Sequence, residues 1–254
     1  MKLNYKRLGT GKPLIVLHGL FGSLDNWMTL AKKWSNDFEI FLVDQRNHGQ
    51  SPHSNEFSYP LMADDLKELM DKLELESAIL LGHSMGGKTV MEFSMKYPEM
   101  VEKLIVVDIA PVSYNVHHHT IIDALRSVPL ADISSRKEAE NILSQHIKDV
   151  GTRQFLLKNL YWQDQGKLAW RFNLEVLAGE ILPISEYANM KGSFQKETLF
   201  ITGSKSDYIL PEYGSNIKSK FPKYELESIS GAGHWVHAEK MDEFSQVVMN
   251  FLKL

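Results

Sequence analysis

The sequence AILLGHSMGGKT, from Ala78 to Thr89, decides the fold because it matches two motifs with incompatible chemistries. Read as Gly82-x-Ser84-x-Gly86 after an apolar run, it predicts the sharp turn that lifts a nucleophilic serine above a parallel sheet. Read from Gly82 to Thr89 as G-x-x-x-x-G-K-T, it predicts a loop that cradles nucleotide phosphates. The rest of the chain has to decide between an acyl group and a nucleoside triphosphate.

Composition and charge narrow the classes of protein. The chain has 254 residues, of which 43% are hydrophobic, so it can bury the core of a single large α/β domain. Its formal net charge is -4 and it has no long basic run, which argues against nucleic acid and anionic membranes and favours a small-molecule partner. Cysteine is absent, so disulfides and thiol nucleophiles are excluded and a covalent mechanism falls to serine.

The start of the chain and its apolar runs bear on location. The segment from Met1 to Arg7 contains no apolar signal sequence. The apolar runs, such as residues 14–17, are far too short to cross a bilayer. We therefore expect a cytoplasmic protein without membrane insertion.

Apolar runs and helical stripes alternate along most of the chain. Between the runs, apolar residues recur with the 3.6-residue period of helices, for example from Met62 to Leu73 and from Phe244 to Phe251. This alternation predicts an α/β protein with a mostly parallel central sheet flanked by helices. Several runs lack polar alternation, as expected of strands covered on both faces, and the five candidate strands are 14–17, 39–43, 78–81, 104–107 and 199–202.

One long segment interrupts the alternation. Residues 112–195 show no convincing buried strand and have the pattern of helices. Ser135 opens a capping box, and Gly151 is expected to close the helix that follows it. We therefore expect a core made of residues 1–111 and 196–254, into which a helical cap, 112–195, is inserted.

The phosphate interpretation has one further feature in its favour. The run from Lys103 to Asp108 is an aliphatic strand that ends in an acid, as a magnesium site would need. Against it, the loop would follow the fourth or fifth strand instead of opening the domain, and two other glycine-flanked histidines would have no role. A P-loop-like nucleotide-binding protein is the alternative that these residues leave open.

The serine interpretation gives both histidine segments a role. In VLHGLFGS, residues 16–23, a His-Gly turn after an early strand can point a backbone N–H at the carboxyl edge of the sheet. An acyl-transfer site needs two such donors, one of them from the residue after the nucleophile, so Leu20 and Met85 are the candidates for the oxyanion hole. In GAGHWVHAEK, residues 231–240, small residues leave His234 accessible as a general base.

The same late segment also raises the question of a metal. His234 and His237, with Glu239, have the residue types of metal ligands. Their spacing is a weak signal without a further converging ligand, and His237 fits better as a residue at the start of the last helix. We therefore predict no metal site.

Six segments together resemble one family. They are LHGLFGSLDNW, VDQRNHGQS, GHSMGGK, VVDIAPV, WRFN and GAGHWVHAEK, which run in this order from Leu17 to Lys240. The chain resembles the α/β-hydrolases, and specifically the small bacterial esterases and thioesterases of the YbfF type. The resemblance implies an α/β-hydrolase fold with a helical cap after the sixth strand, no metal or organic cofactor, and cleavage of carboxylic esters or acyl thioesters through an acyl-enzyme. Under it, Lys88 and Thr89 continue the helix behind the serine.

The acid that orients His234 has two candidates. In most α/β-hydrolases this acid follows the late strand in a G-x-x-D turn, but FITGSKSDY places Ser206 there and Asp207 one position later. The other candidate is Asp108, which ends the strand after the serine's helix. The resembled family has a serine at the late position and an aspartate in the D-I-A-P stretch, which favours Asp108, with Asp207 as the alternative.

The remaining candidates concern the substrate. Four aromatic residues and one histidine are candidates for the lining of an acyl pocket, although packing in the core explains each of them equally well: Phe21, His83, Trp170, Phe172 and Trp235. A protein that carries the serine, the histidine and the acid can also be a ligand receptor with little turnover. The predicted partner in both cases is a small-molecule ester or thioester.

Overall fold

A mostly parallel sheet forms the centre of the molecule. The computed structural model describes residues 1–115, 119–163, 166–186 and 190–253. The seven-stranded sheet has the spatial order β1-β3-β2-β4-β5-β8-β9, in which β1 runs antiparallel to β3 and every other neighbouring pair is parallel. Its strands are β1 (Tyr5–Leu8), β2 (Lys12–Leu17), β3 (Phe38–Val43), β4 (Ala78–His83), β5 (Val101–Val107), β8 (Thr198–Gly203) and β9 (Tyr224–Ile229).

The five predicted apolar runs lie in β2, β3, β4, β5 and β8. Every residue of β3, β4 and β8 is buried, which explains why these strands show no polar alternation. The structure adds two edge strands, β1 and β9, whose residues are mostly exposed or half-buried. The predicted architecture, a mostly parallel sheet flanked by helices, is confirmed.

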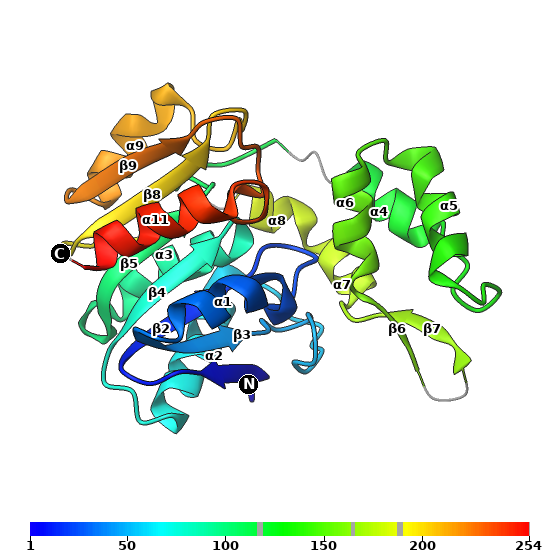
Figure 1. The fold of residues 1–254 in the computed structure, drawn as a ribbon, viewed down its shortest axis with the longest axis horizontal. Helices are drawn as coiled ribbons and strands as arrows, with labels where there is room; N and C mark the ends of the chain where they lie inside the picture. Colours follow the sequence, from blue (N-terminus) through cyan, green and yellow to red (C-terminus); the bar gives the residue numbers. More distant parts are fainter. Residues whose placement is uncertain (116–118, 164–165, 187–189, 254) are drawn as a thin grey trace.

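Helices cover both faces of the sheet (Figure 1). The sheet therefore divides the hydrophobic core into two layers. On one face, Trp27, Trp34 and Phe244 pack with the inward side chains of β2 and β3. On the other, Leu66 and Phe93 pack with the opposite side chains of the same strands. The core helices are α1 (Met28–Trp34), α2 (Tyr59–Lys72), α3 (Met85–Lys96), α9 (Gly214–Lys220), α10 (Val236–Glu239) and α11 (Met241–Leu252), with short 3-10 turns at Leu24–Trp27, Pro98–Met100 and Pro211–Tyr213.

The segment between β5 and β8 forms a separate lobe beside the core (Figure 1). We call this lobe the cap. Its apolar side chains, among them Leu143, Leu160 and Leu177, form a third hydrophobic cluster that also includes core residues such as Met62 and Met85. Its elements are α4 (His119–Arg126), α5 (Arg136–His146), α6 (Val150–Leu157), β6 (Leu160–Trp162), β7 (Leu168–Trp170), α7 (Leu174–Gly179) and α8 (Ile181–Ser185).

The cap differs from the prediction in three details. It follows the fifth strand in chain order and not the sixth, because only one edge strand and four buried strands precede it. It is not wholly helical, since β6 and β7 pair as a short antiparallel hairpin. Gly151 does not close a helix: α5 ends at His146, and the Asp149 side chain accepts a hydrogen bond from Thr152 N at 2.6 Å, which starts α6 around Gly151. The predicted opening at Ser135 is confirmed.

Candidate active site

Ser84 lies on a strained turn between β4 and α3. Its φ of 52° is in the left-handed region, which a residue with a side chain seldom adopts. The turn is possible because glycines stand at both flanks. A Cβ on Gly82 would lie 2.1 Å from Gly86 O, and a Cβ on Gly86 would lie 2.6 Å from His18 O. The spacing G-x-S-x-G therefore follows from close contacts between backbone segments that expose the serine hydroxyl.

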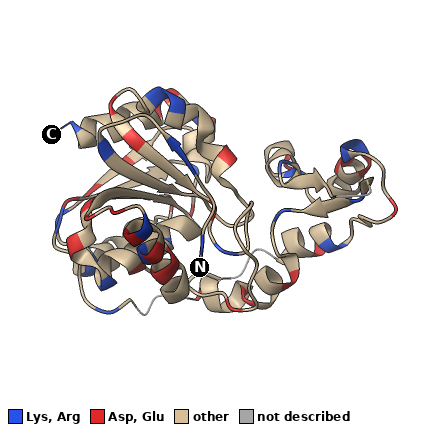
Figure 2. Ribbon diagram, turned by 90° about the horizontal axis from the view of Figure 1, so that it is seen from below, with Lys and Arg blue, Asp and Glu red and all other residues tan. Residues whose placement is uncertain are grey.

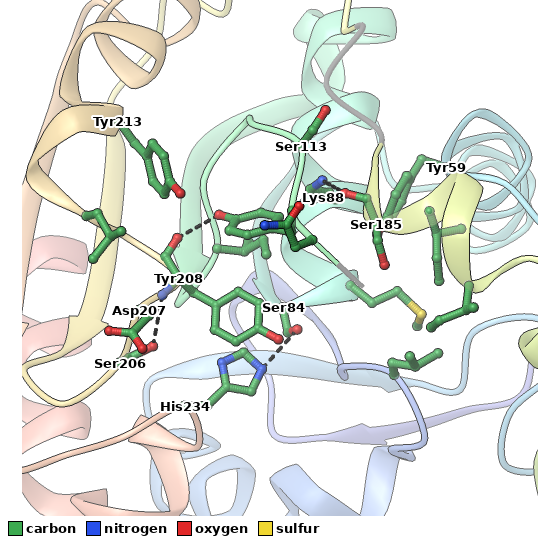
Figure 3. Close-up of a pocket in the computed structure, with 18 of the residues that line it drawn as sticks. Tyr59, Ser84, Lys88, Ser113, Ser185, Ser206, Asp207, Tyr208, Tyr213 and His234 are labelled. Atoms are coloured by element: carbon green, nitrogen blue, oxygen red, sulfur yellow. Dashed lines mark hydrogen bonds between the residues drawn. The ribbon is translucent and has the colours of Figure 1, made fainter. Parts of the chain in front are cut away.

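Three polar side chains form a continuous hydrogen-bonded chain at the carboxyl edge of the sheet. His234 Nε2 lies 3.1 Å from Ser84 Oγ, and His234 Nδ1 lies 2.7 Å from Asp108 Oδ2. Figure 3 shows the Ser84 hydroxyl and the His234 ring facing each other inside the pocket. Because Asp108 accepts at Nδ1, that nitrogen carries the proton in the neutral ring and Nε2 is free to accept the serine proton. The structure thus brings together Ser84, Asp108 and His234 in the geometry of a nucleophile, a base and an orienting acid.

The environment of Asp108 separates it from Asp207. Asp108 is fully buried, and besides His234 it accepts hydrogen bonds from Thr202 Oγ1 at 2.8 Å, Gly203 N at 3.3 Å and Ser206 Oγ. Asp207 is exposed at the rim of the pocket. The serine at the late-strand position therefore binds the acid that comes from the neighbouring strand.

A cavity of about 580 Å³ opens beside Ser84. Tyr208 forms one wall and stacks on the His234 ring at a centroid distance of 4.1 Å, as Figure 3 shows. The only signal in the sequence for a role of Tyr208 in the site is its position two residues after Ser206. The other lining residues are mostly apolar or uncharged and come from both the core and the cap, among them Leu20, Tyr59, Met85, Ile109, Tyr114, Ile181, Ile184 and Tyr213.

The two candidate oxyanion donors, Leu20 and Met85, lie near Ser84. Met85 is the first residue of α3, so its N–H has no partner within the helix. Leu20 comes from the loop after β2, and both residues line the cavity. A Cβ on Gly19 would lie 3.3 Å from Ser84 Cβ, which shows how closely this loop approaches the serine. Both residues therefore lie close to the serine, and their role as oxyanion donors is taken up below as part of the proposed function.

The five candidates for the acyl pocket have the packing role that the sequence also allowed. None of them is among the residues that line the cavity. Phe21, Trp170 and Phe172 pack in the third hydrophobic cluster, and Trp235 contacts Phe155 of the cap at a centroid distance of 5.4 Å. Aromatic residues near a catalytic motif fill a core as readily as they line a cavity, so the residue type does not separate the two placements.

His83 also lies outside the cavity, but it contacts His234. Its Nε2–H donates to His234 O at 2.9 Å, and its ring lies 4.8 Å from the His234 ring. A Cβ on Gly19 would lie 2.9 Å from His83 Nδ1. His83 therefore packs between the loop after β2 and the loop that carries His234, and it holds the His234 backbone in place.

The residues of the phosphate motif are engaged in other contacts. Gly82 is part of strand β4 and a single residue separates β4 from α3, so no multi-residue loop is present to surround a phosphate. Lys88 Nζ donates to Val112 O at 2.8 Å, and burial lowers the pKa of this lysine to about 7. Thr89 Oγ1 is buried and donates to Gln45 Oε1 at 2.9 Å. The motif match thus reflects the elbow and the helix that follows it.

Charged side chains are spread over the surface of the molecule. Figure 2 shows lysines and arginines interspersed with aspartates and glutamates over both the core and the cap. Among the residues that the structure describes, no group of histidines and carboxylates has the arrangement of a metal site, and His237 instead stacks on Trp27 at 4.2 Å. In the same residues, no helix has the length and apolar character that a bilayer crossing would demand.

Four histidines around the site are buried without charge. His18, His48, His83 and His237 are each at most 4% exposed. Burial lowers the pKa of His18 to about 4 and the pKa of His48 and of His237 to about 3, and it lowers the pKa of His83 well below the ordinary value. Each of these rings therefore stays neutral in the folded protein at a pH where the unfolded chain would already bind a proton.

This difference predicts a protein that loses stability in mild acid. Above the unfolded-state pKa of about 6.5 the four rings are neutral in both states and contribute nothing. Below it, only the unfolded chain takes up protons, so each ring lowers the free energy of unfolding by about 1 kcal/mol per pH unit. From pH 7 to pH 5 we expect the sum to reach several kcal/mol, seen as a lower urea midpoint.

A variant tests whether the histidines are the cause. Phenylalanine at position 237 keeps the stack on Trp27 and removes one titrating group. Between pH 5 and pH 7, the free energy of unfolding of His237→Phe should therefore depend less steeply on pH. The difference should equal the contribution of one titrating histidine. An unchanged slope in this variant would contradict the assignment.

Comparisons with known proteins agree with this site. The sheet, the elbow serine and its bonded histidine and aspartate define a serine hydrolase of the α/β type. Residues 12–137 match the alpha/beta hydrolase fold family, and the chain belongs to this family. It is 38% identical to Esterase YbfF of Escherichia coli, over 99% of each chain. It is 39% identical to the sn-1-specific diacylglycerol lipase ABHD11 of Mus musculus, over 94% of this chain and 80% of that protein.

A solved structure extends the likeness to the backbone. The chain matches a marine microorganism esterase with a TM-score of 0.96 and 41% identity, over 98% of both chains. The predicted resemblance to the YbfF-type esterases is thereby confirmed. Together with the site geometry, these likenesses make the protein a serine hydrolase of the esterase and lipase type.

Proposed function

We propose that the protein cleaves carboxylic esters through an acyl-enzyme formed on Ser84. The observation that carries the proposal is the hydrogen-bonded chain from Ser84 Oγ through His234 to Asp108. Ser84 Oγ attacks the carbonyl carbon of the ester and its proton passes to His234 Nε2. The N–H groups of Leu20 and Met85 stabilise the resulting oxyanion, and Asp108 stabilises the imidazolium.

The second half of the reaction releases the acid. The bond to the leaving group breaks, and the alcohol departs with the proton that His234 carries. A water molecule then gives a proton to His234 Nε2 and attacks the acyl carbon. Collapse of this second tetrahedral intermediate releases the carboxylic acid and returns the proton to Ser84 Oγ. No metal or organic cofactor has a role in these steps.

The proposed substrates are small acyl esters, with acyl thioesters as an extension of the same chemistry. A cavity of about 580 Å³ has the size of a site for a small organic ligand. A thioester follows the same steps, with a thiol that takes the proton from His234 as the leaving group. One relative is named a diacylglycerol lipase, so glycerol esters belong in the same comparison.

A substrate series tests this proposal. We expect p-nitrophenyl esters of increasing acyl length to be hydrolysed with a maximum at one length, because a cavity of limited volume accepts longer chains less well. Acyl-CoA and diacylglycerol with the preferred acyl group, tested beside them, show which leaving group is used. Turnover of none of these compounds, or turnover that survives loss of Ser84, would contradict the proposal.

Two alternatives predict different results in simple assays. A receptor that keeps the three residues would release one equivalent of p-nitrophenol in a burst and then stop. A nucleotide-binding protein would show a thermal shift with magnesium and a nucleoside triphosphate. We expect continuous turnover and no nucleotide-dependent shift.

A further inference from the structure

Phe21 has an unusual backbone for a bulky residue. It directly follows Leu20, and its φ of 57° lies in the left-handed region. Such a conformation persists only where the surroundings hold it. At Phe21 the peptide groups on both sides are held: its N–H donates to His48 Nε2 at 3.2 Å, and its carbonyl accepts from Asn159 Nδ2 at 2.7 Å.

The first of these two partners is a fixed part of the core. His48 is fully buried and burial lowers its pKa to about 3, so the ring is neutral. Its Nδ1–H donates to Arg46 O at 2.9 Å, which leaves Nε2 as the acceptor for the N–H of Phe21. The core therefore supplies one of the two holds on the backbone of Phe21.

The second partner belongs to the cap. Asn159 lies between α6 and β6 and is 1% exposed. Its carbonyl accepts from Arg171 N at 2.9 Å and its N–H donates to Leu156 O at 3.0 Å, so the residue is anchored within the cap on both sides. The bond from its side chain to Phe21 O is therefore a link between the cap and the loop that follows β2.

The Phe21 side chain adds a second link to the same place. The ring is 2% exposed and lies 5.1 Å from Phe172, which stacks on Trp170. These rings belong to a hydrophobic cluster that joins residues of the cap and of the core, so the Phe21 side chain packs against the cap. In Figure 1 the dark blue loop after β2 reaches toward the base of the cap.

We infer that Asn159 is a positioning residue that couples the seating of the cap to the oxyanion hole. The inference rests on the proposed function, in which Leu20 N–H is an oxyanion donor. With the cap seated, Asn159 and the aromatic cluster hold Phe21 in the left-handed conformation, and the peptide of the preceding residue is thereby aimed at the oxyanion. Without that hold, Phe21 relaxes toward an ordinary conformation and the donor beside it turns away. The cap thus shapes the catalytic edge as well as the cavity.

The test compares two alanine variants of asparagines that join the cap to the core. Asn159→Ala removes the bond to Phe21, whereas Asn173→Ala removes a bond from the Asn173 side chain to Asn47 Oδ1 at 3.4 Å and leaves both hydrogen bonds of the Phe21 backbone in place. Each variant is assayed for kcat and KM with the best p-nitrophenyl ester. Each is also titrated with a trifluoromethyl ketone of the same acyl length, which forms a tetrahedral adduct with the serine.

We expect Asn159→Ala to lower kcat by about 10- to 100-fold, somewhat less than the direct loss of an oxyanion donor. KM should change by less than about threefold, while the ketone should bind more weakly by the same factor as kcat, because both report on the transition state. Asn173→Ala should change each quantity by less than about threefold. A merely structural role of Asn159 would lower the melting temperature without this matched loss in kcat and ketone affinity.

A second variant and a control on the unaltered protein separate failure of this inference from failure of the proposed function. Asn159→Leu fills the space that alanine would leave, so it replaces the alanine variant if that one fails to fold, with the same expected loss. Equal behaviour of the position-159 and position-173 variants, with normal ketone binding by the unaltered protein, would overturn the role of Asn159 alone. Absence of serine-dependent ketone binding in the unaltered protein would overturn the proposed function itself.

Discussion

Replacing Ser84 by alanine is expected to lower ester turnover by about 10⁴-fold or more, the size of the loss when the nucleophile of such a triad is removed. The Oγ of Ser84 is the atom that lies 3.1 Å from His234 Nε2, and the chain has no cysteine to replace it. Without it, His234 can only activate water. The rate of p-nitrophenol release with the best acyl ester measures the effect.

The size of this effect depends on the fold staying intact. Alanine keeps the backbone atoms of the elbow, and the Ser84 N–H can still donate to Val107 O at 2.9 Å. We expect KM and the melting temperature to change little. Ser219→Ala, at an exposed position on α9, serves as the matched control and should retain full activity.

Covalent labelling gives an independent result for the same residue. A fluorophosphonate should add one label per chain, and peptide mass analysis should place it on Ser84. The label should be absent in Ser84→Ala and present in Ser219→Ala. Retention of activity or labelling by Ser84→Ala would show that another group is the nucleophile.

The elbow and the sheet could be predicted because each depends on local rules. The glycines at positions 82 and 86 are required by backbone contacts that any side chain would violate, so the motif itself describes the turn. Buried strands show as apolar runs because both of their faces are covered. The edge strand β1 was missed, because its sequence YKRL is half exposed and carries two charges.

Other features depend on contacts between distant segments, which the sequence alone does not reveal. The hairpin of β6 and β7 has three residues in each strand, too few for a periodic pattern. Phe21 was a candidate for the acyl pocket, but its ring packs against Phe172 of the cap. A residue of the cap more than a hundred positions later bonds to its carbonyl. The role of Tyr208 could not be predicted, because this residue stacks on His234 and the two residues lie on separate loops.

The choice between Asp108 and Asp207 yields the second large effect. Asp108→Asn is expected to lower the rate by about 10³- to 10⁴-fold, whereas Asp207→Asn should lower it by less than about threefold. In the structure Asp108 Oδ2 contacts His234 Nδ1, and Asp207 is exposed at the rim of the cavity. Rates with one ester, together with melting temperatures, compare the two variants directly. Loss of activity in Asp207→Asn alone would reverse the assignment.

The mechanism of this loss follows from the donors around Asp108. Its Oδ1 accepts from Gly203 N, which cannot become an acceptor, so an asparagine must keep its oxygen on that side. The new amide NH₂ then faces Ser206 Oγ and His234 Nδ1, both of which can accept. The imidazole proton therefore moves to Nε2, where it blocks the transfer from Ser84. Because Thr202 Oγ1 and Gly203 N keep their acceptor and the new amide faces two groups that can accept, we expect the fold to be kept while the base is lost.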